Sequence, residues 1–440
     1  MCIYTGVSIM MVIKRDYYLE QLISKAGNGK IKVVAGLRRS GKSYLLNHIY
    51  KDYLLASGVN ESSIISFSLD KKKHAKYRNP LFLSEAIEEA SARITGKIYL
   101  FIDEIQLCAP ADNPDNPGSV VTFNDVLADY YDDPRYDVYV SGSNSHMLSK
   151  DIVTEFADRG DIIEMRPLTF KEFFEFKGGD PYSAWKEYFT FGGMPYAVAS
   201  CKSDDEKIRY LSGLFEETYL KDIKEHVHAE REDALRELIL DLCSSVGSLT
   251  NPSKIARTMK STNGISVTDD TISSYLKGST DSFLFSEALR YDVKGKRYFE
   301  YPSKFYCADV GLRNCWLNLR QQEENHIMEN IIFCELISRG LSPDVGVVES
   351  FAKDENHKTV RTTTEIDFVI NTPNGRYYIQ SALDVSDEEK RAQETRPFRN
   401  LRDFRKKIVI DKSTPKPYFS EDGVLYCSII DFLLNPSLLQ

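Results

Sequence analysis

The octapeptide GLRRSGKS at residues 36–43 has the spacing G-x-x-x-x-G-K-S that is typical of a phosphate-binding loop. An apolar run at residues 31–35 precedes it and predicts a buried strand. Apolar residues from Leu46 to Tyr53 follow at helical spacing. Glycines let several backbone amides point at one phosphate, and a helix N-terminus adds partial positive charge. The sequence therefore predicts a strand, a phosphate-binding turn and a helix.

The side chains of this loop have separate predicted roles. Lys42 is expected to reach the β- and γ-phosphates of a nucleoside triphosphate, and the hydroxyl of Ser43 to bind Mg²⁺. A glycine turn of chance origin is the alternative, and the flanking elements count against it. The cofactor-binding residues predicted from the motif are Gly36, Leu37, Arg38, Arg39, Ser40, Gly41, Lys42, Ser43 and Tyr44.

Two carboxylates, Asp103 and Glu104, follow a second apolar run at residues 98–102. Such a run predicts a strand buried on both faces, and parallel sheets bind ligands at the carboxyl ends of their strands. Asp103 is expected to hold Mg²⁺, directly or through water, and Glu104 to orient and deprotonate the attacking water. A solvated acidic strand end is the alternative interpretation.

Three more polar residues are candidates for catalysis. Ser143 and Asn144 end a predicted strand, where either could hydrogen-bond the γ-phosphate or the water, or simply cap a turn. Arg159 lies between a predicted helix at residues 150–158 and a predicted strand at 161–165. It is either an arginine finger that reaches a neighbouring subunit's nucleotide or a surface charge.

Length and composition limit the classes of protein that fit. A chain of 440 residues exceeds one ordinary core, and its 42% hydrophobic and 28% charged residues are those of a soluble globular protein. The net charge of −9 confines any nucleic-acid surface to a local patch. The eight cysteines are scattered without a C-x-x-C pair, which favours a reducing cytoplasm over zinc sites or disulfides. No apolar run reaches membrane-spanning length.

The middle of the chain predicts helices and then a winged segment. Residues 176–240 are rich in helix formers and are interpreted as a lid or connector. Two short predicted helices and a hairpin turn at residues 294–296 give residues 241–305 a winged-helix pattern. His226 and His228 are interpreted as surface residues of a helix, because a third metal ligand is missing nearby.

The predicted wing is locally basic. Contact with the phosphates of DNA through residues 250–305 is one interpretation, and protein docking or a solvated turn is the other. The predicted recognition helix carries few cations, which counts against strong base readout. The cations of the wing are Arg290, Lys294, Lys296, Arg297 and Lys304.

The motifs together resemble prokaryotic AAA-type ATPases that carry a C-terminal restriction-endonuclease-like domain of unassigned function. The resemblance rests on the loop at Gly36, the tetrapeptide DEIQ at residues 103–106, the strand end SGS at 141–143, and Arg159. It continues through the segments PLTFKEF and GGMP, which begin at residues 167 and 192. It implies that Lys42, Ser43, Asp103 and Glu104 are the ATP and Mg²⁺ residues, and it favours ATP over GTP.

The resemblance also makes a prediction for residues 306–440. A restriction-endonuclease-like core needs an Asp, then D/E-x-K on the next strand, to hold Mg²⁺ and orient water. Asp367 fits the first position, but Gln380 and Ala382 occupy the other two. Ala382 cannot replace a lysine ammonium, so we expect a degenerate domain that serves docking or scaffolding. A metal-dependent nuclease is the alternative.

These observations lead to one fold and one leading function. The expected fold class is an α/β P-loop NTPase with a parallel sheet at residues 1–175. The lid at 176–240, the winged segment at 241–305 and the small α/β domain at 306–440 complete it. The expected function is Mg²⁺-dependent binding and hydrolysis of ATP, which switches engagement of a DNA or protein partner. An ATP-gated DNA-binding regulator is the alternative. The partners considered are DNA, a protein bound by the C-terminal domain, and further copies of the chain.

Overall fold

The computed structural model describes residues 13–143, 160–321, 323–353, 359–401 and 403–439. Its first half contains a five-stranded parallel sheet in the order β2-β3-β6-β1-β7, which confirms the predicted P-loop NTPase fold. The strands are β1 (Ile31–Gly36), β2 (Ile64–Ser68), β3 (Ile98–Asp103), β6 (Tyr136–Gly142) and β7 (Gly160–Met165). A small hairpin, β4 (Ala111–Asp112) and β5 (Val120–Val121), lies outside this sheet.

Helices cover both faces of the parallel sheet. Side chains of the first three helices, among them Tyr18, Leu22 and Leu46, pack on one face, and Leu83 and Leu127 of the next two pack on the other. The helices are α1 (Asp16–Lys25), α2 (Lys42–Tyr44), a π-helical stretch (Leu45–Tyr50), α3 (Lys51–Ala56), α4 (Pro80–Ser91) and α5 (Phe123–Tyr131). Short 3₁₀ turns lie at Glu61–Ser63, Lys72–Arg78 and Ile105–Leu107.

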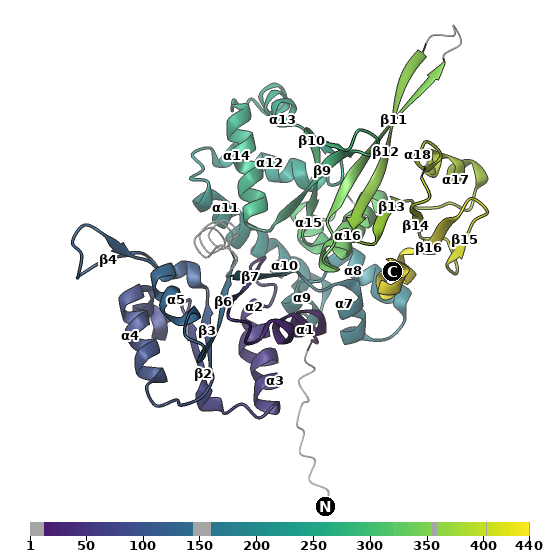
Figure 1. Ribbon diagram of the computed structural model, residues 1–440. Coiled ribbons are helices and arrows are strands. Elements are labelled where there is room, and N and C mark those ends of the chain that lie inside the picture. The colour runs from purple at the N-terminus through teal and green to yellow at the C-terminus, as the bar shows by residue number, and fades with distance from the viewer. Residues whose placement is uncertain (1–12, 144–159, 322, 354–358, 402, 440) are drawn as a thin grey trace, which may run out of the picture.

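A helical middle segment connects the two halves of the molecule (Figure 1). Several of its helices, such as α7 (Phe170–Lys177), begin at polar caps that the sequence supplies. The Thr169 hydroxyl accepts from the backbone N–H of Glu172, and the Glu172 carboxylate accepts from that of Thr169. The helices are α7 (Phe170–Lys177), α8 (Pro181–Phe191), α9 (Pro195–Ala199), α10 (Asp204–Leu214), a π-helical stretch (Phe215–Leu220), α11 (Lys221–His226), α12 (Glu232–Ser244), α13 (Pro252–Thr258), a π-helical stretch (Met259–Asn263), α14 (Asp269–Asp281) and α15 (Val310–Trp316).

The second half is built on a nine-stranded mixed sheet in the order β15-β16-β14-β13-β12-β11-β9-β10-β8. Its strands are β8 (Leu249–Thr250), β9 (Phe285–Asp292), β10 (Arg297–Cys307), β11 (Pro343–Lys353), β12 (Thr359–Thr372), β13 (Gly375–Ser381), β14 (Lys406–Asp411), β15 (Tyr418–Phe419) and β16 (Val424–Ser428). The helices of this half are α16 (Glu324–Ser338), α17 (Glu388–Glu394), α18 (Arg396–Arg399), α19 (Ile429–Leu434) and a closing 3₁₀ turn (Pro436–Leu439).

The nine-stranded sheet runs across a boundary predicted from the sequence at residue 305. β9 of the wing pairs in parallel with β11, so the wing and the C-terminal strands share one sheet. The boundary expected at residue 305 therefore falls inside β10, which runs to Cys307. β16 pairs with β14 on the side away from β13. In the described part of the chain, no helix is long and apolar enough to cross a membrane.

Candidate nucleotide site

The loop after β1 has the backbone conformation that its glycines predict. Gly36 has φ +143°, and a Cβ at this position would lie 2.1 Å from the carbonyl oxygen of Met165. Gly41 has φ +103°. Residues that carry a side chain rarely adopt either of these φ angles. The hydroxyl of Ser40 is fully buried in the loop without a hydrogen-bond partner among the described residues. The loop thus forms a cradle with an unsatisfied polar atom, which suits a bound phosphate.

Lys42 is buried and makes no ion pair within the described residues. Its Nζ donates to the carbonyl oxygens of Gly36 (2.9 Å) and Leu37 (3.0 Å). Burial lowers the pKa of Lys42 from its ordinary 10.5 to about 8, although the carboxylates of Glu104 and Asp103 raise it. Neutral carbonyl oxygens are weaker partners for an ammonium than a phosphate is. The side chain is therefore set to exchange these bonds for a phosphate oxygen.

The acidic residues at the carboxyl end of β3 contact the neighbouring strand β6. The hydroxyl of Ser141 donates to the carboxylate of Asp103 and accepts from the backbone N–H of Glu104 at 3.3 Å. Glu104 itself has φ +55°, a left-handed conformation that aims its side chain away from the strand direction. Ser143 Oγ lies 3.5 Å from Glu104 Oε2, so the structure brings this candidate to the carboxylate.

Gln106 is a member of this site that the residue-by-residue reasoning missed. Its amide Nε2 donates to the Glu104 carboxylate and lies 3.3 Å from Ser143 Oγ. The signal was present in the tetrapeptide at residues 103–106, which carried the family resemblance but no assigned role for the glutamine. The amide fixes the orientation of Glu104. Asn144 and Arg159 lie outside the described residues.

A cavity of about 1030 Å³ opens over the loop. Arg38 to Tyr44 and Glu104 line one side, and Asp103 lies behind them, buried against Ser141. Other lining residues come from segments that carried no sequence motif for a nucleotide: Ile13, Leu168, Phe176, Pro195, Tyr196, Ala199, Ser200 and Tyr210. These residues add an apolar and aromatic wall of the kind that organic ligands occupy. The cavity therefore joins the parallel-sheet domain to helices α9 and α10.

Contacts also tie the phosphate-binding loop to the end of the helical segment. Arg38 Nη1 lies 2.7 Å from Asp222 Oδ1 of α11, and the Tyr219 hydroxyl donates to the Arg38 carbonyl at 2.9 Å. Burial raises the pKa of the Asp222 carboxyl to about 6, although Arg38 lowers it. The loop is therefore linked to α11 by an ion pair and to the preceding π-helical stretch by a hydrogen bond.

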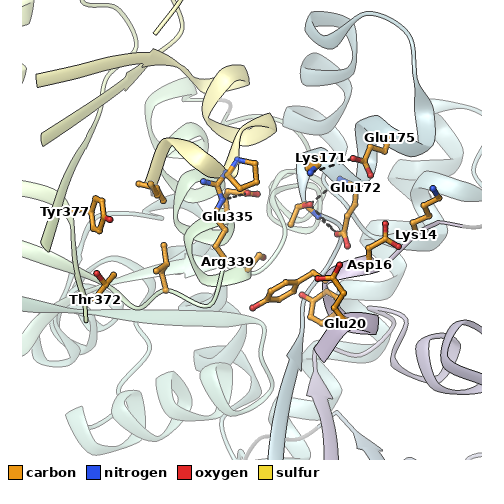
Figure 2. A pocket seen from close by; sticks show the side chains of 17 residues that line it. Lys14, Asp16, Glu20, Lys171, Glu172, Glu175, Glu335, Arg339, Thr372 and Tyr377 are labelled. Carbon is orange, nitrogen blue, oxygen red and sulfur yellow. Dashed lines mark hydrogen bonds and ion pairs between the residues drawn. The ribbon is translucent and has the colours of Figure 1, made fainter. Parts of the chain in front are cut away.

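A second cavity, of about 550 Å³, lies between α1, α7 and the C-terminal half (Figure 2). Glu172, Glu175 and Lys171 of α7 face Glu335 and Arg339 of α16 across it. Arg339 Nε lies 2.7 Å from Glu335 Oε1 on the same helix. Most of the charges lining this cavity are balanced locally, so its shape reflects how the two halves pack together.

Two of the five cations of the wing are paired with carboxylates, whereas Lys294 and Lys296 are exposed. Lys304 is buried, with its Nζ 3.0 Å from Glu329 and 2.8 Å from Glu365. Arg297 lies 3.5 Å from Asp292. These cations were grouped by sequence, whereas their carboxylate partners come from distant elements or from the opposite strand. Lys304 therefore cannot contact DNA in this arrangement, and Arg297 is partly neutralised.

Of the residues predicted from the restriction-endonuclease-like pattern, Asp367 lies close enough to interact with the buried ammonium of Lys304. Asp367 accepts from the backbone N–H of Ser381 at 2.8 Å, and burial raises its pKa well above the ordinary range, with the nearby Glu329 carboxylate adding to this. Gln380 is buried beside it with an unpartnered Oε1. Among the described residues, no cluster of three carboxylate, imidazole or thiol side chains is set to hold a metal ion. His226, which contacts Asp281 at 3.2 Å, belongs to none.

Two parts of the chain match known domain families. Residues 28–174 match an AAA domain. Residues 182–323 match a domain of unknown function, DUF8612. The second match begins in α8 and ends after α15, so it includes both the predicted lid and the predicted winged segment. The restriction-endonuclease-like character of the C-terminal region stays a prediction.

Relatives of similar sequence cover most of the chain. An uncharacterized protein of Haemophilus influenzae is 33% identical over 431 residues, which span 96% of this chain and 99% of that protein. An uncharacterized protein of Methanocaldococcus jannaschii is 28% identical over 407 residues, which span 86% of this chain and 79% of that protein.

Solved structures are more distant. The Walker-type ATPase of Pyrococcus abyssi aligns with a TM-score of 0.44 at 12% identity, covering 70% of this chain and 96% of that chain. The ORC2 protein of Aeropyrum pernix aligns with a TM-score of 0.39 at 11% identity, covering 73% and 92%. Likenesses this weak transfer no function.

Proposed function

The chain belongs to the same family as the uncharacterized Haemophilus influenzae protein and carries an AAA domain, and on this premise we propose that it binds ATP with Mg²⁺ and hydrolyses the γ-phosphate. The observation that carries the proposal is the buried Lys42 ammonium, which lies on the wall of a large cavity and whose hydrogen bonds to described residues go to two loop carbonyls. A triphosphate in the cradle would replace those carbonyls as the partner of the lysine.

The residues around the cradle divide the chemistry among them. Ser43 and Asp103 would hold Mg²⁺, which when bound neutralises charge on the phosphates. Glu104 orients and deprotonates the attacking water, and Gln106 and Ser143 hold its carboxylate in place. The unpartnered Ser40 hydroxyl and the glycine backbone fit a phosphate, because both need an external acceptor.

The same cavity suggests how nucleotide occupancy reaches the rest of the chain. A nucleotide in it would touch the loop on one side and Tyr196 and Tyr210 on the other. Arg38 and Asp222 connect the loop to α11. We therefore propose that binding and hydrolysis alter how the helical segment sits on the AAA domain, and thereby how a DNA or protein partner is engaged. Arg159 retains its proposed role as an arginine finger within an assembly.

ATP hydrolysis by purified protein tests the site. We expect Lys42→Ala and Glu104→Gln each to lower the rate by about a hundredfold or more. Glu104→Gln is expected to retain ATP binding, because its carboxylate acts on water and not on the phosphates. Lys73→Ala, at an exposed position of a 3₁₀ turn, is the matched control and should keep the wild-type rate. Equal rates in all four proteins would reject the proposed site.

A further inference from the structure

A groove of about 490 Å³ lies between the turn that joins β9 to β10 and the turn that joins β12 to β13. Three cations line it from three separate elements: Lys296, Arg376 and Arg405. Asp403 is the carboxylate among the residues that line it. We call this cavity the basic groove. A local excess of positive charge contrasts with the net charge of −9 of the whole chain.

The cations of the basic groove outnumber the described carboxylates near them, which are Asp403 in the groove and Asp344, whose carboxylate interacts with Arg376. Arg376 donates to the side-chain oxygens of Asn371 (2.7 Å) and Tyr291 (3.0 Å), both neutral groups. Lys296 and Arg405 are exposed, and neither side chain forms an ion pair with a described residue. The Asp403 carboxylate accepts from the hydroxyl of Tyr378 at 2.7 Å. The groove therefore favours an anionic ligand from outside.

The surface beside the groove adds an aromatic side chain. Phe404 is fully exposed, and it lies between two residues that line the groove, Asp403 and Arg405. The surrounding segment, residues 390–407, has eight Lys and Arg against two Asp and Glu. The Phe404 ring is open to solvent on the same loop as Asp403 and Arg405, where a planar ligand can reach it. Cations that bind phosphates, together with an exposed ring on which a base stacks, are the two parts of a single-strand binding surface.

We propose that the basic groove binds the backbone of single-stranded nucleic acid, with Lys296, Arg376 and Arg405 contacting phosphates and Phe404 stacking on a base. This surface shares only Lys296 with the predicted contact through residues 250–305, because its other two cations, Arg376 and Arg405, come from the C-terminal region. The stacking ring favours a single strand, since the bases of a duplex are already stacked. The proposal goes beyond the ATPase and does not depend on it.

The test measures binding of a fluorescent oligo-dT of about 20 nucleotides to the full chain, without ATP, by anisotropy. We expect Arg405→Glu and Lys296→Glu each to weaken binding roughly tenfold and to reduce the salt dependence of the affinity. Lys73→Glu makes the same charge change on the AAA domain and is expected to leave the affinity unchanged. Both groove variants are at exposed positions on different elements, so a folding defect in one leaves the other informative.

Phe404→Ala separates stacking from charge. This change is expected to lower the affinity for the single strand roughly tenfold and to change the affinity for a duplex of the same length little. Inorganic phosphate serves as a competitor. If the groove is a site for free phosphate, millimolar phosphate would displace the oligonucleotide; if the groove binds a nucleic-acid backbone, the oligonucleotide should remain bound. Absence of oligonucleotide binding, or equal affinity of the groove variants and Lys73→Glu, would overturn the proposal and would favour an acidic protein segment. The same assay on Lys42→Ala keeps this result separate from failure of the ATPase site.

Discussion

The two halves of this molecule each bury a lysine beside carboxylates, and the two lysines differ in what holds them. Lys42 donates to neutral carbonyl oxygens, and burial lowers its pKa. Lys304 contacts Glu329 and Glu365; burial would lower its pKa too, but these carboxylates and Asp367 raise it above the ordinary value. The first ammonium has exchangeable partners, whereas the second is already neutralised. A lysine close to carboxylates is therefore not enough to indicate an anion-binding site. What indicates one is that the lysine is hydrogen-bonded to neutral groups.

The largest effect that would test this comparison is on stability in the C-terminal half. Lys304→Met is expected to lower the free energy of unfolding by about 3–5 kcal/mol, because it leaves buried carboxylates without a counter-charge. Urea titrations followed by circular dichroism measure the change. The double variant Lys304→Met with Glu329→Gln should lose less than the sum of the single changes. A loss below about 1 kcal/mol for Lys304→Met would contradict the internal neutralisation described here.

The next effect concerns pH and nucleotide affinity at Lys42. The ammonium form is the one that binds a phosphate, and its pKa is about 8. Affinity for ATP is therefore expected to fall as pH rises through about 8, approaching tenfold per pH unit above it. Titration with a fluorescent ATP analogue between pH 7 and pH 9 measures this, with Lys42→Arg as the control that stays protonated. A flat profile in the wild type would show that phosphate binding does not require this proton.

How far these properties could be read from the sequence differs between the two halves. Apolar runs located β1 and β3. The phosphate-binding loop motif placed Lys42, and the acidic end of β3 placed Glu104, because both are patterns of neighbouring residues. Lys304 was grouped with a basic wing, because its partner Glu365 lies in a distant strand and pairing across a sheet is not visible in a short window.

A smaller effect is expected on stability at the nucleotide site. The pKa of Lys42 is lowered on folding, so the unfolded chain binds more protons between about pH 8 and 10.5. The buried charge therefore disfavours folding below pH 8, and this penalty disappears as pH rises to 10.5. Lys42→Met should be as stable as wild type at pH 7, within about 1 kcal/mol, or more stable. A loss of several kcal/mol in thermal or urea unfolding would mean that the ammonium holds the loop together.

The last prediction is that the protein does not cleave DNA. We expect plasmid DNA to remain intact with the protein and Mg²⁺ or Mn²⁺, because Ala382 supplies no ammonium and Lys304 is already paired with carboxylates. Gel electrophoresis after prolonged incubation measures cleavage. Asp367→Ala is the control: metal-dependent cleavage that this change abolishes would mean that Lys304 can release its partners and serve a nuclease.

The pairing of β9 with β11 has a consequence for inheritance. If the gene were divided between the two matched families and the C-terminal region, β9 would lose its neighbour β11. The open edge of β9 would then be a template for aggregation. Recombination between relatives is therefore constrained to exchange the wing and the C-terminal strands as one block. Whatever partner this protein serves, the strands of the wing and the C-terminal strands have to evolve in step.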